Sequence, residues 1–386
     1  MDDLVRTSKV VLATLHGAGG GQLRQARFDV VIIDEASQAM EAQCWVPLIS
    51  AKKAVLAGDH LQLPPTVKST NSKSKSKPEA KAKKPTGDSD QPAITKSAKS
   101  AGDNATKSVD EKSNKSGNGK TPKFVSKEEG AVDSHDSASL ETTLFDRLLA
   151  MHGSSIKRML TTQYRMHEKI MSFPSTELYD SKLIAAETVK HRLLSQLPGV
   201  QETEDTKEPV IFYDTQGGDW AEKAEEENLA KNRSMAESKS NEMEAALVVQ
   251  HVRKLIDAGL DPQDIACITP YNAQLSILSQ ALKTRFPGIE LGTVDGFQGR
   301  EKEAVIFSLV RSNGDKEVGF LAEKRRLNVA MTRPRRQLVV IGDSETISTG
   351  GEFLKRWMLH LEEWADLRYP DPSELSLDLG SLKIGD

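Results

Sequence analysis

The sequence predicts an α/β protein whose strands form parallel sheets. Short apolar runs along the chain are continuous rather than alternating, which is typical of strands that are buried on both faces of a parallel sheet. In the second half of the chain these runs alternate with amphipathic helical patterns, as the crossovers of a parallel sheet require. Two of the early runs end in acidic residues, at the sheet edge where open α/β proteins bind ligands.

The first block of predicted structure lies within residues 1–67. It contains three strand-like runs, at residues 9–15 (KVVLATL), 28–34 (FDVVIID) and 54–59 (AVLAGD). We interpret residues 1–67 as an incomplete α/β domain.

The composition changes sharply over residues 68–137. This segment is rich in Lys, Ser, Gly and Pro and has almost no large apolar side chains, so it cannot bury enough surface to offset the entropy of ordering. We expect a disordered insertion in a surface loop, acting either as a spacer or as a basic tether for nucleic acid. A second polar stretch, residues 217–240, is expected to be a loop or an exposed helix.

Regular structure is predicted again over residues 138–370, which we interpret as a complete α/β domain followed by a tail at residues 371–386. Helical spacing predicts helices at residues 140–151, 241–259 and 273–286. Apolar runs predict strands at residues 210–215, 265–271, 304–310 and 337–343.

Composition narrows the class of protein. The 386 residues are enough for two domains, and an apolar content of 37% indicates that part of the chain is not packed. The formal net charge of −4 does not indicate any particular class of partner, so a nucleic-acid site would need a local basic patch. The two cysteines, Cys44 and Cys267, offer no disulfide framework or zinc spacing and fit a reducing compartment. Because no signal peptide or membrane-length apolar run is present, we expect a soluble, intracellular protein.

Asp34 and Glu35 directly follow the second apolar run. A carboxylate at the end of a buried strand can hold Mg²⁺ through water, as in Walker B sites, and its neighbour can orient or deprotonate an attacking water. The alternative is that both acids stabilise the positive end of the following helical segment, residues 35–42.

Two further segments carry side chains that suit phosphate chemistry. Gln62 lies in the loop of residues 57–65 (AGDHLQLPP), where an amide could sense a γ-phosphate or its water, although the loop could also be an ordinary Pro-terminated turn. Arg165, within residues 161–170 (TTQYRMHEKI), could stabilise charge on a transferring phosphoryl group or could pair with a surface acid.

The last two segments flank a predicted strand. Gly296 and Gly299 surround Phe297 and Gln298 in a loop that either lets backbone approach a ligand or forms a plain turn. A helix then ends in Arg333, Arg335 and Arg336, which could be an arginine finger, a phosphate-backbone contact or a solvated helix end.

The order of these segments carries a family resemblance. The stretches DEASQ, GDHLQLPP, QYRMH, VDGFQGREK and NVAMTRPRR resemble motifs II to VI of superfamily 1 helicases, in the branch that translocates 5′ to 3′. The sequence is most similar to the immunoglobulin-mu-binding helicases and the helicases associated with DNA polymerase alpha, and more distantly to the nonsense-mediated-decay helicases. The resemblance implies two RecA-like domains and covers nearly all of the predicted ordered sequence, excluding the two polar stretches.

The resemblance also implies roles for individual residues. Asp34 would coordinate Mg²⁺ through water, Glu35 would activate water, and Gln62 would contact the γ-phosphate of ATP. Arg165 and Arg333 would be arginine fingers from the second RecA-like domain. Glu301 would bind the ribose, and Tyr164 would lie near the base. The pair Gln298 and Gly299 would couple the nucleotide to the nucleic-acid channel. Residues 238–245 (SKSNEMEA) also match a family segment, at Asn241 and Glu244, and receive no role.

One family motif has no counterpart among these residues. A P-loop, GxxxxGK[ST], should lie well before motif II, and the Gly-rich stretch at residues 16–25 (HGAGGGQLRQ) has no Lys-Ser/Thr ending. We therefore expect an incomplete first RecA-like domain with an exposed sheet edge and apolar core. Four interpretations follow: an ATP-dependent helicase, an inactive fragment that binds nucleic acid or a partner, an incomplete gene model, or a helicase fused to a nuclease, for which no spare acidic cluster exists.

The resemblance implies the remaining properties. The expected cofactors are ATP and Mg²⁺, and the expected partners are single-stranded DNA or RNA and replication or RNA-processing factors. We expect a monomer that does not contact membranes and acts in the nucleus, the cytoplasm or both.

Overall fold

The computed structural model describes residues 2–67, 140–218, 220–224, 238–371, 373 and 375. The predicted insertion at residues 68–137 and nearly all of the predicted tail lie outside the described residues. At the two ends of the polar stretch 217–240, strands β6 (Lys223–Ala224) and β7 (Lys239–Ser240) form a short antiparallel pair, and most of the intervening residues are also outside.

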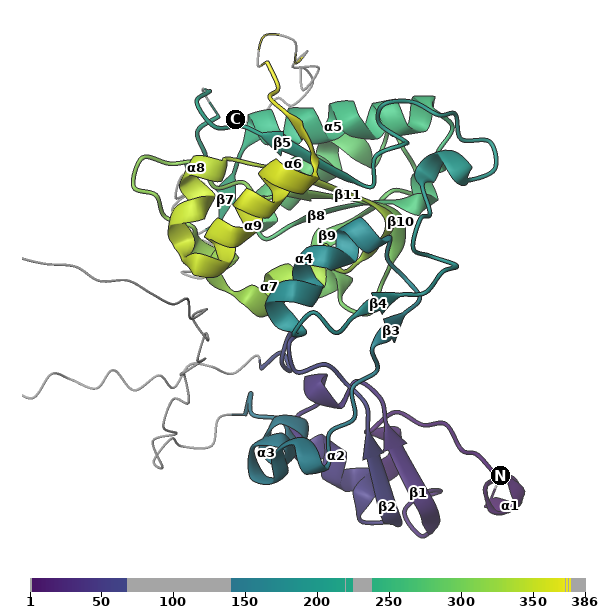
Figure 1. The fold of residues 1–386 in the computed structure, drawn as a ribbon. Helices are drawn as coiled ribbons and strands as arrows, with labels where there is room; N and C mark the ends of the chain where they lie inside the picture. The colour runs from purple at the N-terminus through teal and green to yellow at the C-terminus, as the bar shows by residue number, and fades with distance from the viewer. Residues whose placement is uncertain are drawn as a thin grey trace, which may run out of the picture. The chain divides into compact units, whose positions relative to one another are not determined.

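A two-stranded parallel sheet forms from the first block of sequence. Strand β1 (Phe28–Ile33) pairs with β2 (Ala51–Leu56), and helix α2 (Glu41–Leu48) connects them (Figure 1). Helix α3 (Leu144–His152) joins this part of the fold, because Leu144 packs into a small core with Ile33 and Cys44. The strands predicted at residues 28–34 and 54–59 are therefore confirmed, as is the helix at 140–151.

Two expectations for this block are wrong. Residues 9–15 do not form a strand, and the side chains of Val10 and Leu12 are 76% and 92% exposed. The strands β1 and β2 are not buried on both faces, since Ile32 and Val55 are 70% and 51% exposed. The physical reason is that helices of the described chain cover one face of this sheet, so the apolar residues of the other face remain open to solvent.

A six-stranded parallel sheet forms the larger part of the fold. The strand order is β12-β5-β11-β10-β8-β9, and every neighbouring pair is parallel. The strands are β5 (Val210–Asp214), β8 (Ile265–Thr269), β9 (Glu290–Thr293), β10 (Lys302–Ser308), β11 (Pro334–Gly342) and β12 (Asp366–Arg368). All four strands predicted in this region are confirmed, and the α/β prediction with parallel sheets is confirmed as well.

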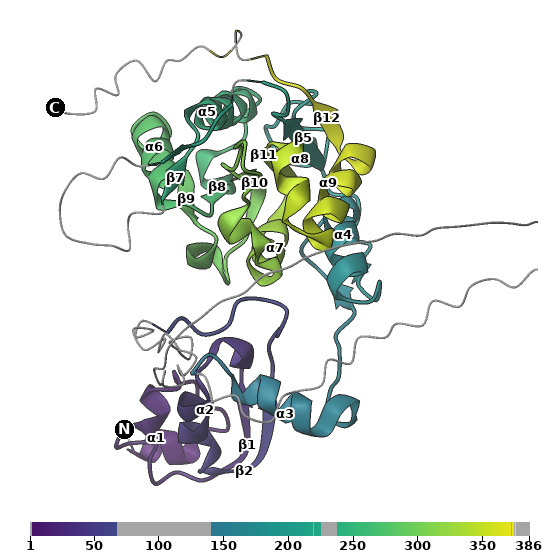
Figure 2. The same ribbon diagram turned by 90° about the vertical axis from the view of Figure 1, so that its left-hand side faces the viewer.

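Helices cover both faces of this sheet, as Figures 1 and 2 show. The side chains of Ile211 and Ile306 point into a core with α5 (Glu242–Asp257) and α6 (Asn272–Leu282), both of which were predicted. The side chain of Phe307 points into the opposite core, which is formed with α4 (Glu168–Leu178), α7 (Lys324–Met331) and α9 (Glu352–Trp364). Alternate residues of fully buried strands thus serve opposite cores, which explains the continuous apolar runs.

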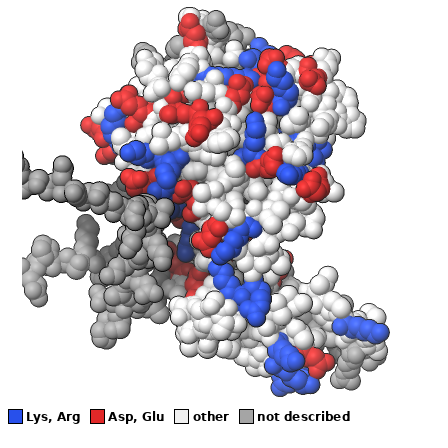
Figure 3. All heavy atoms as spheres, in the orientation of Figure 1, with Lys and Arg blue, Asp and Glu red and all other residues white. Residues whose placement is uncertain are grey.

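The small elements complete the described fold. Strand β3 (Thr162–Gln163) pairs in parallel with β4 (Ile184–Ala185), α1 (Asp2–Thr7) lies near the N-terminus, and α8 (Ser344–Ile347) follows β11. None of the helices in the described part of the chain is long and apolar enough to cross a membrane. Figure 3 shows Lys and Arg side chains interspersed with Asp and Glu side chains on the face it displays, in line with the small net charge.

Candidate nucleotide and nucleic-acid sites

The two carboxylates of the first motif follow β1 directly and are exposed. Asp34 accepts a hydrogen bond at Oδ1 from the backbone N–H of Glu35 (3.0 Å), and Glu35 has a left-handed backbone with φ of 52°. The Glu35 carboxylate accepts a hydrogen bond from Gln38 Nε2 at 2.6 Å. Glu35 is the N-cap residue of the short 3-10 helix Ala36–Gln38, but its side chain makes no capping hydrogen bond, and α2 begins only after Met40. The helix-stabilising alternative therefore has no support from side-chain capping. Both carboxylates remain accessible at the carboxyl end of the strand, where a ligand can reach them.

A hydrogen-bonded loop lies beside these carboxylates. The backbone N–H of Asp59 donates to Ser37 Oγ at 2.9 Å, which ties the loop after β2 to the turn after β1. The Asp59 carboxylate accepts from Gln62 Nε2 (2.9 Å) and from Tyr179 Oη (2.6 Å). Burial, together with the negative charge of Asp59, raises the pKa of the Tyr179 phenol well above its usual value. The Gln62 amide is therefore held in a fixed orientation, with its oxygen free to face another group.

Arg333 faces that amide oxygen. Its Nη2 donates to Gln62 Oε1 at 3.3 Å, while its Nε donates to the carbonyl oxygen of Val329 at 2.9 Å. The residue is 2% exposed, and burial lowers the pKa of its guanidinium to about 10, with the nearby positive charge of Arg165 adding to this effect. The charge of Glu35 opposes this shift. Arg333 therefore stays protonated at neutral pH in a position close to the first motif.

Arg165 is held by different partners. Its Nε donates to the Glu301 carboxylate, and its Nη1 donates to the carbonyl oxygen of Thr332 at 3.0 Å. Glu301 also accepts from Arg335 Nε at 3.1 Å. Burial raises the pKa of the Glu301 carboxyl, but the hydrogen bonds from Arg335 and Arg165 outweigh this effect and hold the pKa below its usual value. In this structure Arg165 is thus paired with an acid, as one of the two sequence interpretations expected.

The structure leaves some predicted residues apart. Tyr164 is 71% exposed, and Gly299 has a left-handed backbone with φ of 79° and open space around its Cα. Gln298 reaches the loop after β2 only through a 3.5 Å hydrogen bond to the carbonyl oxygen of Leu63. Arg335 and its neighbour Arg336 lie in β11 and pair with acids, so the interpretation of both as a solvated helix end is wrong.

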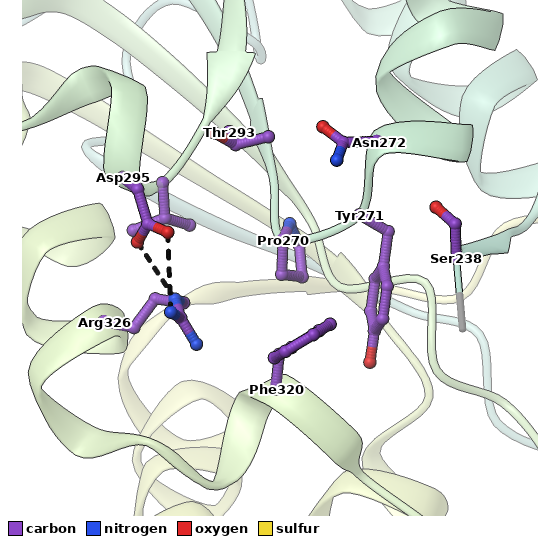
Figure 4. A pocket seen from close by; sticks show the side chains of 9 residues that line it. Ser238, Pro270, Tyr271, Asn272, Thr293, Asp295, Phe320 and Arg326 are labelled. Carbon is purple, nitrogen blue, oxygen red and sulfur yellow. Dashed lines mark hydrogen bonds and ion pairs between the residues drawn. The ribbon is translucent and has the colours of Figure 1, made fainter. Parts of the chain in front are cut away.

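A separate cavity of about 230 Å³ opens at the carboxyl ends of β8 and β9 (Figure 4). Pro270 and Tyr271 follow β8, and Asp295, which follows β9, accepts a hydrogen bond from Arg326 Nε at 3.1 Å. The other side of the cavity is lined by Phe320, whose ring centroid lies 5.4 Å from that of Tyr271. The lining also includes Asn272, the first residue of α6, so the amino end of this helix faces the cavity.

Comparison with known proteins assigns the chain to a family. Two family models, both described as an AAA domain, match residues 1–70 and residues 140–345. The second match alone covers more than half of the chain. The chain belongs to the AAA-domain family of superfamily 1 helicases. The resemblance found in the sequence motifs is confirmed.

Several curated helicases and related proteins are similar to this chain. The DNA polymerase alpha-associated DNA helicase A of Schizosaccharomyces pombe is 45% identical over 94% of this chain and 44% of its own length. The protein of the same name from Saccharomyces cerevisiae is 40% identical over 96% of this chain and 47% of its own length. The DNA-binding protein SMUBP-2 of Mesocricetus auratus is 40% identical over 93% of this chain and 29% of its own length. The chain thus spans less than half the length of each of these three relatives.

Sequence reasoning missed part of this hydrogen-bond network. Asn328 Nδ2 donates to Tyr179 Oη (2.7 Å) and to the carbonyl oxygen of Leu61 (3.0 Å), and it thereby extends the Asp59 network. Asn328 lies inside the quoted stretch NVAMTRPRR, so the motif held a signal for it. Tyr179 lies outside every quoted motif, at the end of α4, and nothing in its sequence context marked it.

Proposed function

We propose that this chain supplies the catalytic carboxylates and arginine fingers of an ATP-dependent helicase that translocates 5′ to 3′ on single strands. The observation that carries the proposal is the contact of Arg333 with Gln62, because it joins the motif VI arginine to the loop that is tied to Asp34 and Glu35. The names of the relatives from the two yeasts support a helicase. In this proposal residues 1–67 belong to the first RecA-like domain, together with helix α3, which packs into its core, and the rest of residues 138–370 forms the second.

Each proposed role matches a chemical feature of the site. Asp34 keeps Oδ2 available for the water shell of Mg²⁺, which would neutralise phosphate charge when bound. Glu35 is exposed and can accept a proton from an attacking water. Gln62 would turn its amide toward the γ-phosphate. Arg333 is already desolvated and protonated, so it can stabilise the charge that develops on the phosphoryl oxygens with little reorganisation.

The second arginine requires a change of partner. Arg165 is bound to Glu301, the residue proposed to bind the ribose. Arg335 holds the same carboxylate from β11, so Glu301 would keep one cationic partner if Arg165 turned toward the γ-phosphate. Tyr164 is accessible and would lie against the base, while Gln298 and Gly299 would link the nucleotide to the strand-binding face.

The cavity beyond β8 and β9 is proposed to hold the single strand. It combines an aromatic surface for a base, given by Phe320, with the positive end of the α6 dipole, which favours a phosphate. Single-stranded DNA or RNA is the proposed substrate, with replication or RNA-processing factors as partners. We place the protein in the nucleus, the cytoplasm or both, and propose that it acts as a monomer.

The test is directional unwinding. Because the 386 residues contain no GxxxxGK[ST], the assay uses a fusion in which a P-loop-bearing segment from a superfamily 1 relative precedes residue 1, called the P-loop chimera below. Duplexes with a 5′ or a 3′ single-stranded overhang are incubated with the chimera, with and without ATP. The proposal expects ATP-dependent unwinding of the 5′-overhang duplex only. Binding of both duplexes without unwinding would instead contradict the helicase proposal and support a binding module.

A further inference from the structure

The segment at residues 238–245 has no role in the site described so far. Asn241 is the N-cap of α5 and accepts a hydrogen bond at Oδ1 from the backbone N–H of Glu244 at 3.0 Å. Both residues are 0% exposed. Capping explains the Asn241 oxygen, but it does not explain the hydrogen bonds of the Asn241 amide nitrogen and the Glu244 carboxyl group.

Both side chains bind Val310, which lies just after strand β10. The Glu244 Oε2 accepts from the backbone N–H of Val310 at 2.9 Å and from Ser308 Oγ at 2.7 Å. The Asn241 Nδ2 donates to the carbonyl oxygen of Val310 at 3.3 Å and to that of Trp220 at 2.6 Å. Both backbone polar groups of Val310 are therefore bound by the same short segment.

Val310 needs this support because its backbone is strained. Its φ of 73° lies in the left-handed region, which a β-branched side chain strongly disfavours. Such conformations persist where the surroundings hold them in place, and they are common at binding sites. Val310 comes two residues after the end of β10, directly before Arg311.

The residue after the turn reaches the wall of that cavity. Arg311 is 4% exposed, and its Nε donates to Glu222 Oε2 at 2.7 Å. Its Nη1 lies 3.3 Å from the Tyr271 hydroxyl oxygen, and Tyr271 lines the cavity (Figure 4). The fit is tight, since a Cβ added to Gly319 would lie 2.3 Å from Arg311 Nη1 and 2.6 Å from the Tyr271 hydroxyl oxygen.

We infer that Asn241 and Glu244 are positioning residues for the strand-binding cavity, acting through the left-handed turn at Val310 and through Arg311 on Tyr271. The inference rests on the proposed function only in taking the cavity to bind single strands. The role of the segment is then to fix the cavity wall before the strand arrives, rather than to contact the strand.

The experiment compares four proteins with the wild-type chain: Glu244→Ala, Glu244→Gln, the double variant Glu244→Ala with Val310→Gly, and Glu242→Ala. The Gln variant keeps an oxygen acceptor for Val310, and glycine adopts the left-handed backbone without support. Glu242 is the matched control, because it lies at the same helix end and its carboxylate pairs with exposed Lys223 at 2.8 Å. Binding of a labelled single strand is followed by fluorescence anisotropy, and exchange of backbone amides is followed by mass spectrometry.

The expected result is specific to the turn. Glu244→Ala should bind the strand roughly tenfold more weakly, the change expected when a backbone conformation of this cost loses its support. It should also exchange faster at residues 270–273 and 309–313, with α4 unchanged. The Gln variant and the Val310→Gly double variant should regain strand affinity, and Glu242→Ala should behave like the wild type.

Two results would overturn the inference. Wild-type affinity in Glu244→Ala would show that the cavity does not depend on this carboxyl group. Weak binding that Val310→Gly fails to restore would show that the carboxyl group acts through general stability instead of through the turn. If the wild-type chain binds no single strand, the proposed function fails, and amide exchange at residues 270–273 and 309–313 still decides whether Glu244 positions the wall.

Discussion

Replacing Glu244 with Gln should change how stability depends on pH. Burial raises the pKa of the Glu244 carboxyl to about 8, and the charges of Asp343 and Glu222 add to the rise, while hydrogen bonds from Ser308 and Val310 oppose it. Between the ordinary pKa of 4.5 and about 8, the folded protein holds this proton and the unfolded chain has lost it. The contribution of this group to the free energy of unfolding therefore falls as pH rises through that window, and it levels off above pH 8.

The size of the effect follows from the pKa difference. The rise of the Glu244 pKa from 4.5 to about 8 lowers the free energy of unfolding by roughly 5 kcal/mol between pH 4.5 and pH 8. This is about 1.4 kcal/mol for each pH unit. Glutamine preserves the shape and the acceptor oxygen but does not titrate. Urea unfolding of both proteins between pH 5 and pH 9 should show Glu244→Gln gaining stability over the wild type as pH rises to 8. Parallel stability profiles for the two proteins would refute the reasoning.

Three further outcomes are expected. His251 is fully buried, and burial lowers its pKa to about 4. Acidification from pH 6.5 to pH 4 should therefore lower the free energy of unfolding of the wild type by roughly 3 kcal/mol. Urea unfolding should show that His251→Gln does not lose this stability. Gly319→Ala should destabilise the protein by roughly 2 kcal/mol or more, because φ is +53° and the new Cβ would collide with Arg311; thermal unfolding measures this. Asp59→Ala should remove the acceptor of the buried Tyr179 hydroxyl, cost roughly 1–3 kcal/mol and lower the phenol pKa, which an ultraviolet titration would report.

The sequence predicted the six-stranded sheet well because its central strands are buried on both faces. Each continuous apolar run there, such as residues 304–310, became a strand that serves two cores. The same rule was wrong for residues 9–15 and for the faces of β1 and β2, since an apolar run forms a buried strand only if neighbours cover it. Strands β9 and β12 were missed because they are short and polar.

The candidate site could be predicted in part. Motif order predicts that Glu35, Gln62 and Arg333 serve one site. The structure brings Arg333 into contact with Gln62, and their shared role in that site stays a prediction. Pairing of Arg165 with an acid was one of two interpretations, but the identity of that acid, Glu301, was not foreseen, because the two residues are far apart in sequence and meet only through the fold. The strain at Val310 was also invisible, since a β-branched residue in an apolar run normally indicates an extended backbone.

The central claim is that Glu35 and Arg333 belong to one ATP-hydrolysing site. The most direct measurement is ATP hydrolysis by the P-loop chimera with and without single-stranded DNA, for the wild type, Glu35→Gln and Arg333→Ala, with the unfused chain beside them. The account predicts strand-stimulated hydrolysis by the wild-type chimera, with a loss of at least about 100-fold in Glu35→Gln and about 1,000-fold in Arg333→Ala, and nucleotide binding retained in both. Hydrolysis at the wild-type rate in either variant would contradict it.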